Sequence, residues 1–332
     1  MYNFYMSKKN QLSIVFPVFN EAENINALYE RVVEAIDSTK LLFELFFVEN
    51  GSTDDSLNLI KQLSEKDPRV RYISLSRNFG HQGALYAGLC YAQGDAVITM
   101  DADLQHPPAL IPQMIKEWMS GFEVVYTTKR NHKMSPLLKT QVRFFYWVIS
   151  KLSGLKLSFG QSDFRLLDRK AVNALLSISE YKKFLRGMVH WIGYNQKGLE
   201  YDVESRHSGQ SKFSYWSLIS FALDGIISYS NIPLRLMFLV GLIIAAGAFL
   251  FALITLVQTI LSRMGFGISL PPGWATISIA ITFFGGVQLI TTGILGEYIG
   301  RIYEQTKGLP VFIVKEQSES LAPFGNFQKH HD

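Results

Sequence analysis

Two long apolar runs restrict what this 332-residue chain can fold into more than any other feature. Residues 234–261 carry one charge, Arg235 at their start, and residues 274–295 carry none. Each run exceeds the roughly 20 residues that an α-helix needs to cross the hydrocarbon core of a membrane. We therefore predict a two-helix transmembrane hairpin over 234–298. A pair of buried core helices is the alternative.

Basic residues flank this predicted hairpin and suggest its orientation. The connecting loop has a single basic residue, Arg263, whereas both outer flanks are richer in them: Arg206, Lys212 and Arg235 before, and Arg301, Lys307 and Lys315 after. Because basic residues favour the cytoplasmic side, we expect both termini in the cytoplasm. The start of the chain lacks the apolar stretch of a secretory signal. The predicted location is the inner (plasma) membrane, as a multi-pass protein.

The N-terminal part alternates strand-like and helix-like segments. Such alternation predicts an α/β domain with a mainly parallel, Rossmann-like sheet covered on both faces. Proline is expected to stop the first strand at Pro17. The predicted strands are 12–16, 43–48, 70–75 and 96–100, and the predicted helices are 24–36, 56–63 and 83–92.

The remaining segments complete the predicted organisation. Aromatic and basic residues mix in 136–152 and 211–229, which favours helices lying in the headgroup layer. Residues 308–316 are interpreted as a strand that pairs with a neighbouring subunit, which makes a homo-oligomer possible. The predicted domains are a cytoplasmic catalytic domain, a juxtamembrane amphipathic region, two membrane helices and a cytoplasmic tail: 1–204, 205–233, 234–298 and 299–332.

Composition excludes some functions. The net charge of +4 is mild, and basic residues are not interleaved with aromatics as in nucleic-acid binders, so no nucleic-acid partner is expected. Cys90 is the only cysteine and is interpreted as a packing residue. No G-x-G-x-x-G follows the first strand and no P-loop sequence is present, which argues against a classical dinucleotide fold and a P-loop phosphotransferase.

Polar clusters follow each of the four predicted strands. They read PVFNE, ENGSTDD, SRNFGHQG and DADLQHPP, beginning at residues 17, 49, 76 and 101. Ligands of parallel sheets bind at the carboxyl ends of the strands, so the four clusters predict one site. His81, in the third cluster, is interpreted as a surface or core histidine.

Asp101 and Asp103 stand one residue apart in the last of these clusters. Two carboxylates at this spacing suit a hard divalent cation, Mg²⁺ or Mn²⁺, and Gln105 offers an amide oxygen beside them. Because Mg²⁺ is commonly held by one or two carboxylates and by phosphates of the substrate, the pair predicts a diphosphate ligand. A solvated acidic turn is the alternative.

Taken together, SIVFPVFNE, the Gly-Ser-Thr-Asp turn, DADLQHPP, SDFRLLDR (162–169) and RHSGQSKFS (206–214) resemble family 2 glycosyltransferases of the GT-A fold. The likeness is greatest to polyprenyl-phosphate glycosyltransferases, which include dolichyl-phosphate mannose synthase and the bactoprenol glucosyltransferases, and it extends over roughly residues 11–310. It implies that a sugar is transferred from a nucleotide sugar to undecaprenyl or another polyprenyl phosphate, with inversion at the anomeric carbon. UDP-glucose is the donor that we expect. The chain departs from the family at one position. The family usually has Asp at the second acidic position before Gly-Ser, whereas here Glu49 is followed by Asn50.

The resemblance also implies roles for residues. Nucleotide-sugar contacts are expected from Pro17, Phe19, Glu21, Glu49, Ser52 and Asp101. Asp101, Asp103 and Gln105 would hold the metal and diphosphate, with Asp103 also catalytic.

Asp163 matches the position of the family's general base. We expect it to orient the acceptor or sugar as much as to take a proton, and a structural pairing with Arg165 or Arg169 stays open.

The acceptor phosphate needs positive partners, because Arg in particular suits bidentate contact with phosphate. Arg130, Arg206 and Lys212 are the candidates. Two other functions remain open. One is a processive polysaccharide synthase, although FLRGMVHWIG (184–193) only loosely resembles the Q-x-x-R-W-type motif of that class. The other is a non-catalytic, membrane-tethered binder of nucleotide sugars.

Overall fold

A computed structural model of the chain describes residues 11–130, 161–180, 183–202, 232–264, 273–318 and 321. The chain divides into two compact units, one of residues 1–150, 155–218 and 309–332, the other of 151–154 and 219–308. Each is described by itself. The predicted interfacial segments 136–152 and 211–229 lie outside the described residues, as do Arg206 and Lys212.

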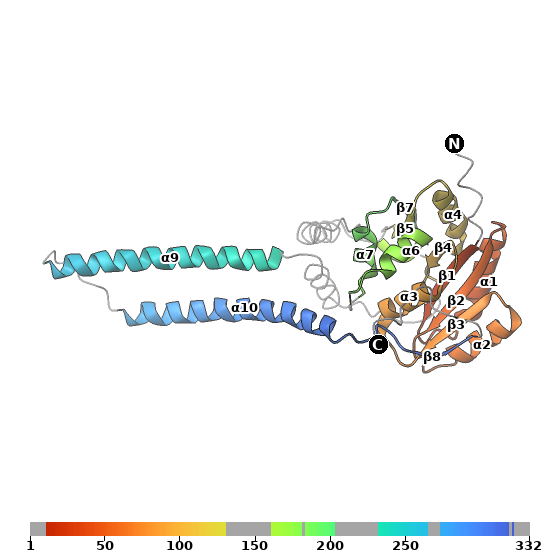
Figure 1. Ribbon diagram of the computed structural model, residues 1–332, viewed down its shortest axis with the longest axis horizontal. Helices are drawn as coiled ribbons and strands as arrows, with labels where there is room; N and C mark the ends of the chain where they lie inside the picture. The colour runs from red at the N-terminus through yellow and green to blue at the C-terminus, as the bar shows by residue number, and fades with distance from the viewer. Residues whose placement is uncertain are drawn as a thin grey trace. The chain divides into compact units, whose positions relative to one another are not determined.

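The first unit is built on an eight-stranded sheet of order β7-β5-β6-β4-β1-β2-β3-β8 (Figure 1). Strands β1, β2, β3 and β4 run parallel to one another, whereas β6 and β8 are antiparallel to their neighbours. The mainly parallel α/β sheet predicted from the sequence is therefore confirmed. The strands are β1 Gln11–Val18, β2 Leu42–Glu49, β3 Val70–Leu75, β4 Ala96–Thr99, β5 Val124–Lys129, β6 Gln161–Asp168, β7 Gln196–Tyr201 and β8 Val314–Gln317.

Helices cover both faces of this sheet. The helix α1 (Ile25–Asp37) buries one stripe of apolar residues at helical spacing, and α4 (Ile111–Met119) buries Trp118 in the same core cluster. On the opposite face, α3 (Gly80–Tyr91) approaches β1 and β2 so closely that a Cβ at Gly88 would lie 2.2 Å from Val15. Both faces of β1 are thus buried, which explains its nearly continuous apolar sequence. The unit also contains α2 Ser56–Lys66, η1 Pro108–Leu110, α6 Arg169–Leu176 and α7 Leu185–Trp191.

Two local predictions were wrong. The strand β1 continues through Pro17, which lies in register with Val48, because the fixed φ of proline suits extended backbone and only its N–H is lost. Residues of the tail form β8, which pairs with β3 of the same chain rather than with a neighbouring subunit. The free edge of β3 offers the unpaired N–H and C=O groups that such a strand needs.

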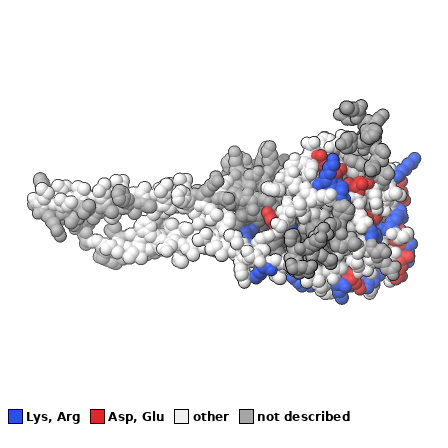
Figure 2. All heavy atoms as spheres, viewed as in Figure 1, with Lys and Arg blue, Asp and Glu red and all other residues white. Residues whose placement is uncertain are grey.

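The second unit contains two long helices, α9 (Ile232–Arg263) and α10 (Trp274–Thr306), which contact each other. Large apolar side chains are exposed on both, for example Phe238 at 74% and Leu289 at 75%. On the face that Figure 2 shows, most of the described atoms of this pair belong to uncharged residues.

Among the described residues, no helix is long and apolar enough to cross a membrane. The two predicted spans are therefore not confirmed.

Candidate functional site

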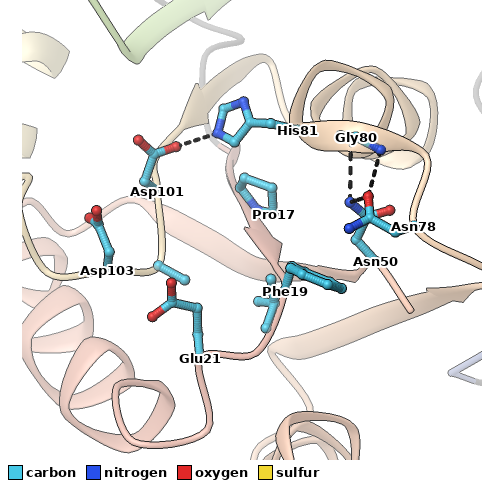
Figure 3. A pocket seen from close by; sticks show the side chains of 11 residues that line it. Pro17, Phe19, Glu21, Asn50, Asn78, Gly80, His81, Asp101 and Asp103 are labelled. Atoms are coloured by element: carbon cyan, nitrogen blue, oxygen red, sulfur yellow. Dashed lines mark hydrogen bonds and ion pairs between the residues drawn. The ribbon is translucent and has the colours of Figure 1, made fainter. Parts of the chain in front are cut away.

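A cavity of about 500 Å³ lies at the carboxyl ends of β1, β2 and β4, beside the start of α3. Figure 3 shows Asp101 and Asp103 on one side of it and Asn50 and Asn78 on another, with Phe19 and Pro17 between. The parallel strands end at one edge of the sheet, which brings these loops together. The lining residues are Pro17, Val18, Phe19, Glu21, Asn50, Asn78, Gly80, His81, Asp101, Ala102 and Asp103.

Two histidines hold Asp101. Its Oδ1 lies 2.7 Å from Nε2 of His81 (Figure 3). Its backbone N–H donates to Nδ1 of His106 at 3.2 Å, so the proton of this ring is on Nε2, which faces the hydroxyl of Ser162 at 2.6 Å. Because Nδ1 accepts and the ring is buried, His106 is a neutral hydrogen-bonding support for the Asp101 backbone.

These contacts also shift pKa values. Burial by itself would raise the pKa of Asp101, but the hydrogen bond from His81 and the charge of that imidazole outweigh it and lower that pKa. Burial would lower the pKa of His81, yet the hydrogen bond and charge of Asp101 raise it above its ordinary value. Burial lowers the pKa of His106. Asp101 is therefore ionised at neutral pH, as a ligand of a divalent cation must be.

Asp103 lines the cavity next to Asp101, but Gln105 is not among the lining residues. The backbone N–H of Gln105 donates to Oδ1 of Asp103 at 3.1 Å, and Leu104 between them has a φ of +60°. This tight turn holds both carboxylates at the cavity. Among the described residues, no group of three or more His, Cys, Asp and Glu side chains is arranged to hold a metal ion.

The second loop places Asn50, not Glu49, at the cavity. Glu49 is buried: its carboxylate accepts the backbone N–H of Ser52 and, at 2.6 Å, the hydroxyl of Ser74. Ser52 in turn accepts the N–H of Asn20 and does not line the cavity. Glu49 and Ser52 thus shape the loop, and their predicted nucleotide contacts stay a prediction.

Asn50 connects the second loop to the third. Its amide N–H groups donate to Oδ1 of Asn78 at 3.2 Å and to the carbonyl of Gly80 at 3.3 Å, while its oxygen accepts the N–H of Phe79. Asn50, Asn78 and His81 were not predicted as site residues. The only sequence signal for them was their position after parallel strands.

Asp163 lies beside this site on β6. Ala96 pairs with Asp168 and Thr99 with Arg165 in the antiparallel β4–β6 ladder, so Asp163 lies two residues before the part of β6 that pairs with β4. Its charge acts on Asp101. The hydroxyl of Thr99 donates to the Asp163 carbonyl at 2.5 Å. Asp163 itself is not among the residues that line the cavity.

Two guanidinium groups hold the carboxylate of Asp163. Arg186 donates from Nε to Oδ1 at 2.9 Å and from Nη2 to Oδ2 at 2.8 Å, and Arg165 donates from Nη2 to Oδ1 at 2.8 Å. Burial would raise the pKa of Asp163, but these two charges outweigh it and hold that pKa far below its usual range. The pairing with Arg165, one of the two structural alternatives left open for Asp163, is present, whereas Arg169 donates to the carbonyls of Ala92 and Gly94 instead.

Of the three predicted acceptor-binding residues, only Arg130 is described. It is half exposed and pairs with two carboxylates, Glu200 at 3.2 Å and Asp202 at 3.7 Å. It does not line the cavity.

Comparisons with known proteins agree with these features. The model of the family "Glycosyl transferase family 2" matches residues 13–176. An uncharacterized glycosyltransferase of Synechocystis is 40% identical over 92% of this chain and 95% of that protein. The bactoprenol glucosyl transferase of Shigella phage SfV is 37% identical over 93% of this chain and 99% of that protein.

A solved structure is also similar in part. Glucosyl-3-phosphoglycerate synthase of Mycobacterium tuberculosis, in complex with Mn²⁺, UDP-glucose and phosphoglyceric acid, is 19% identical, with a TM-score of 0.43 over 66% of this chain and 78% of that one. A similarity of this size says nothing about the ligands of our chain. Relatives near 40% identity that align over almost the full length do establish a family. The chain is therefore a member of glycosyl transferase family 2, a glycosyltransferase related to the bactoprenol glucosyl transferases.

Proposed function

We propose that this enzyme transfers a sugar from a nucleotide sugar to the phosphate of a polyprenol such as undecaprenyl phosphate. The donor that we propose is UDP-glucose, so that the sugar transferred is glucose. The observation that carries the proposal is the carboxylate pair Asp101 and Asp103 on a cavity of about 500 Å³, which is large enough for a nucleotide sugar. The bactoprenol glucosyl transferases, which align over almost the whole chain, support the choice of glucose and of a polyprenyl acceptor.

The donor chemistry fits a divalent cation, Mg²⁺ or Mn²⁺. Asp101 and Asp103 supply oxygen ligands of the kind that these hard cations prefer. Because no three His, Cys, Asp or Glu side chains among the described residues are arranged to hold a metal ion, the donor's diphosphate and water would supply the other ligands. When bound, the cation neutralises the charge that develops on the leaving diphosphate.

The proposed reaction is a single displacement. An oxygen of the acceptor phosphate forms a bond to the anomeric carbon, while the bond from that carbon to the diphosphate breaks and its electron pair leaves with the nucleoside diphosphate. One displacement inverts the anomeric carbon. A phosphate monoester has a second pKa near 6, so it is mostly ionised at pH 7 and the step needs no strong general base.

The nucleotide half of the donor would lie along the first loop. Pro17, Phe19 and Glu21 line the cavity, and Phe19 is 43% exposed there. An exposed aromatic ring at the rim of a cavity is suited to contact with a base or ribose. These three residues support the predicted nucleotide contacts.

The helix pair α9–α10 supports an acceptor that is a lipid. Its exposed apolar side chains extend over both helices, far more than a soluble surface usually carries. We propose that these side chains contact membrane lipid and bring the enzyme to its acceptor at the cytoplasmic face. No observation on the described residues favours a processive polysaccharide synthase.

The test is glycolipid formation by the full-length enzyme. Purified protein in detergent is incubated with undecaprenyl phosphate, Mg²⁺ or Mn²⁺ and a panel of nucleotide sugars, and the lipid is analysed by mass spectrometry. We expect Asp101→Asn and Asp103→Asn to lower turnover by about 100-fold or more, because stabilisation of the leaving group is lost. The control, Asp37→Asn, removes a carboxylate that is 60% exposed near Arg69 and should keep at least half of the activity.

Two results would contradict the proposal. If the wild-type enzyme forms no glycosylated polyprenyl phosphate with any donor, the acceptor is wrong. If both aspartate variants keep full turnover, or if EDTA leaves turnover unchanged, the metal assignment is wrong.

A further inference from the structure

Three successive backbone N–H groups of the first loop, which follows β1, donate to side chains of the second loop, which follows β2. The donors and acceptors are Asn20 to Oγ of Ser52 at 3.1 Å, Glu21 to Oγ of Ser56 at 3.1 Å, and Ala22 to Oδ2 of Asp54 at 3.0 Å. Each bond joins residues that are 32 or 35 positions apart in the sequence. Because backbone N–H groups require partners, the second loop sets the path of the first.

Asn20 returns a hydrogen bond to the second loop. Its side-chain oxygen accepts the N–H of Thr53 at 2.7 Å, and its backbone has a φ of +56°. A positive φ strains most L-residues, but Asn adopts it more readily than the others. The first loop therefore turns at Asn20, and hydrogen bonds from its backbone and its side chain hold that turn against the second loop.

Asp54 is the charged member of this network. Its Oδ1 accepts the N–H of Ser56 at 3.1 Å, while its Oδ2 accepts the N–H of Ala22. Burial by itself would raise the pKa of Asp54, but hydrogen bonds from the Ser56 hydroxyl and from these two backbone N–H groups outweigh it and lower that pKa. Asp54 is therefore ionised at neutral pH, and a hydrogen bond to an ionised acceptor is stronger than one between neutral groups.

The turn at Asn20 lies between two residues of the cavity. Phe19 and Glu21, on either side of it, both line the cavity (Figure 3). The amide of Asn24 also donates to Oε2 of Glu21 at 2.6 Å. A shift of this turn would therefore move the Phe19 ring and the Glu21 carboxylate together. Asp54 is not among the residues that line the cavity, so its influence on a ligand passes through the first loop.

We propose that Asn20 and Asp54 are positioning residues that hold the first loop ready to bind the nucleotide of the donor. The inference rests on the proposed function, in which the side chains of Phe19 and Glu21 contact that nucleotide. A loop that is already held in its bound conformation loses less freedom when the ligand binds, which raises affinity. The network therefore strengthens binding of the nucleotide sugar and leaves binding of the acceptor unchanged.

The experiment measures kcat and both KM values of the full-length enzyme and its variants. Asp54→Ala removes a charged acceptor, so we expect the KM of the nucleotide sugar to rise by about 5- to 20-fold. We expect kcat and the KM of the polyprenyl phosphate to stay within about twofold. Asp54→Asn keeps one side-chain oxygen and should recover part of the loss. Equal changes in both KM values, or an unchanged donor KM, would overturn the inference.

Substitutions of Asn20 separate positioning from a general loss of stability. Asn20→Gly keeps a residue that adopts positive φ but loses the side-chain oxygen, whereas Asn20→Ala loses both. The KM of the nucleotide sugar should therefore rise in Asn20→Gly and rise further in Asn20→Ala. Because Asn20→Gly adds no strain, it keeps the test available if Asp54→Ala does not fold. A lower melting temperature without any change in donor KM would show a structural role alone and contradict the inference.

A binding measurement separates this inference from the proposed function. Calorimetric titration of wild type and Asp54→Ala with UDP and with GDP, each with Mn²⁺, requires no acceptor and no turnover. Weaker binding of the nucleotide to the variant supports the positioning role even if no glycolipid forms, and equal binding contradicts it. A wild-type enzyme that binds neither nucleotide would overturn it as well.

The matched control is Asp55→Ala. It removes the neighbouring carboxylate, whose Oδ1 accepts the side-chain amide of Asn58 at 2.7 Å. This control should leave the nucleotide affinity and the donor KM within about twofold. Thermal unfolding of every variant identifies any that has lost its fold.

Discussion

Gly51 offers a direct test of how the second and third loops are fitted together at the cavity. It follows Asn50 and has a φ of +71°, where a non-glycine residue is strained. A Cβ at this position would lie 2.7 Å from the carbonyl carbon of Arg77 and 2.8 Å from the backbone N of Asn78. Gly51→Ala must therefore push the Asn78 backbone away and disturb the Asn50–Asn78 hydrogen bond.

The structure supplies a control that separates the two costs. Gly193 has the same φ of +71°, but in the part of the chain that the structure describes no atom lies within 4 Å of its added Cβ. Gly193→Ala should lower the free energy of unfolding only by the strain of a non-glycine residue at positive φ, about 1–2 kcal/mol. Gly51→Ala adds the steric overlap, which we expect to destabilise the fold by a further ~1–3 kcal/mol.

The assay is thermal unfolding of both variants, followed by donor kinetics. The additional 1–3 kcal/mol corresponds to a melting temperature roughly 2–12 °C lower for Gly51→Ala than for Gly193→Ala in a domain of this size. Because Asn50 and Asn78 line the cavity, only Gly51→Ala should raise the KM of the nucleotide sugar. Equal melting temperatures and equal KM values for the two variants would refute this account of loop packing.

Two further predictions concern stability and reactivity. The hydrogen bonds from Arg69 outweigh burial and lower the pKa of Asp67 to about 2, so this ionised carboxylate stabilises the fold above about pH 4 and the contribution is lost as pH falls toward 2. Asp67→Asn should lower the free energy of unfolding by ~1–2 kcal/mol at pH 7, since solvent screens the half-exposed Arg69, and this difference should disappear as pH falls toward 2. A difference in denaturation midpoint that stays constant across this pH range would contradict the link between stability and the ionisation of Asp67. Burial raises the pKa of Cys90 to about 12, so we expect the folded enzyme at pH 8 to react with a maleimide about a thousandfold more slowly than the denatured chain. Fast labelling of native protein, followed by mass spectrometry, would show that this thiol is accessible.

Periodicity and strand order explain why much of the fold could be predicted from the sequence. Apolar runs separated by amphipathic helices predict a parallel sheet, and the carboxyl ends of its strands then share one edge. The sequence therefore predicted that the polar clusters after the strands meet at one site, and the family resemblance selected Pro17, Phe19, Glu21, Asp101 and Asp103 among them, all of which line the cavity. These residues lie within a few positions of a strand end, so their place in the sequence is enough to put them near the cavity.

Contacts between distant segments were decided only by the tertiary structure. Successive side chains at the end of β2 point in opposite directions, so Glu49 is buried in the interior and Asn50 lines the cavity. Which of the two faces is the interior depends on the packing of β3 beside β2. The free edge of β3 recruits β8 from more than 200 residues away. Pairing of a strand edge has no local signature, because it depends on which edge the rest of the sheet leaves open.

The same reason applies to Asp163. Its match to a family position and its neighbour Arg165 are visible in the sequence, but Arg186 reaches it from a helix 23 residues further along. Gln82 accepts the N–H of Leu185 at the start of that helix and lies 3.5 Å from Oδ2 of Asp163. The sequence determined which charged residues are available, whereas long-range packing decided which of them meet, because the energy of an ion pair depends on distance in space and not on separation along the chain.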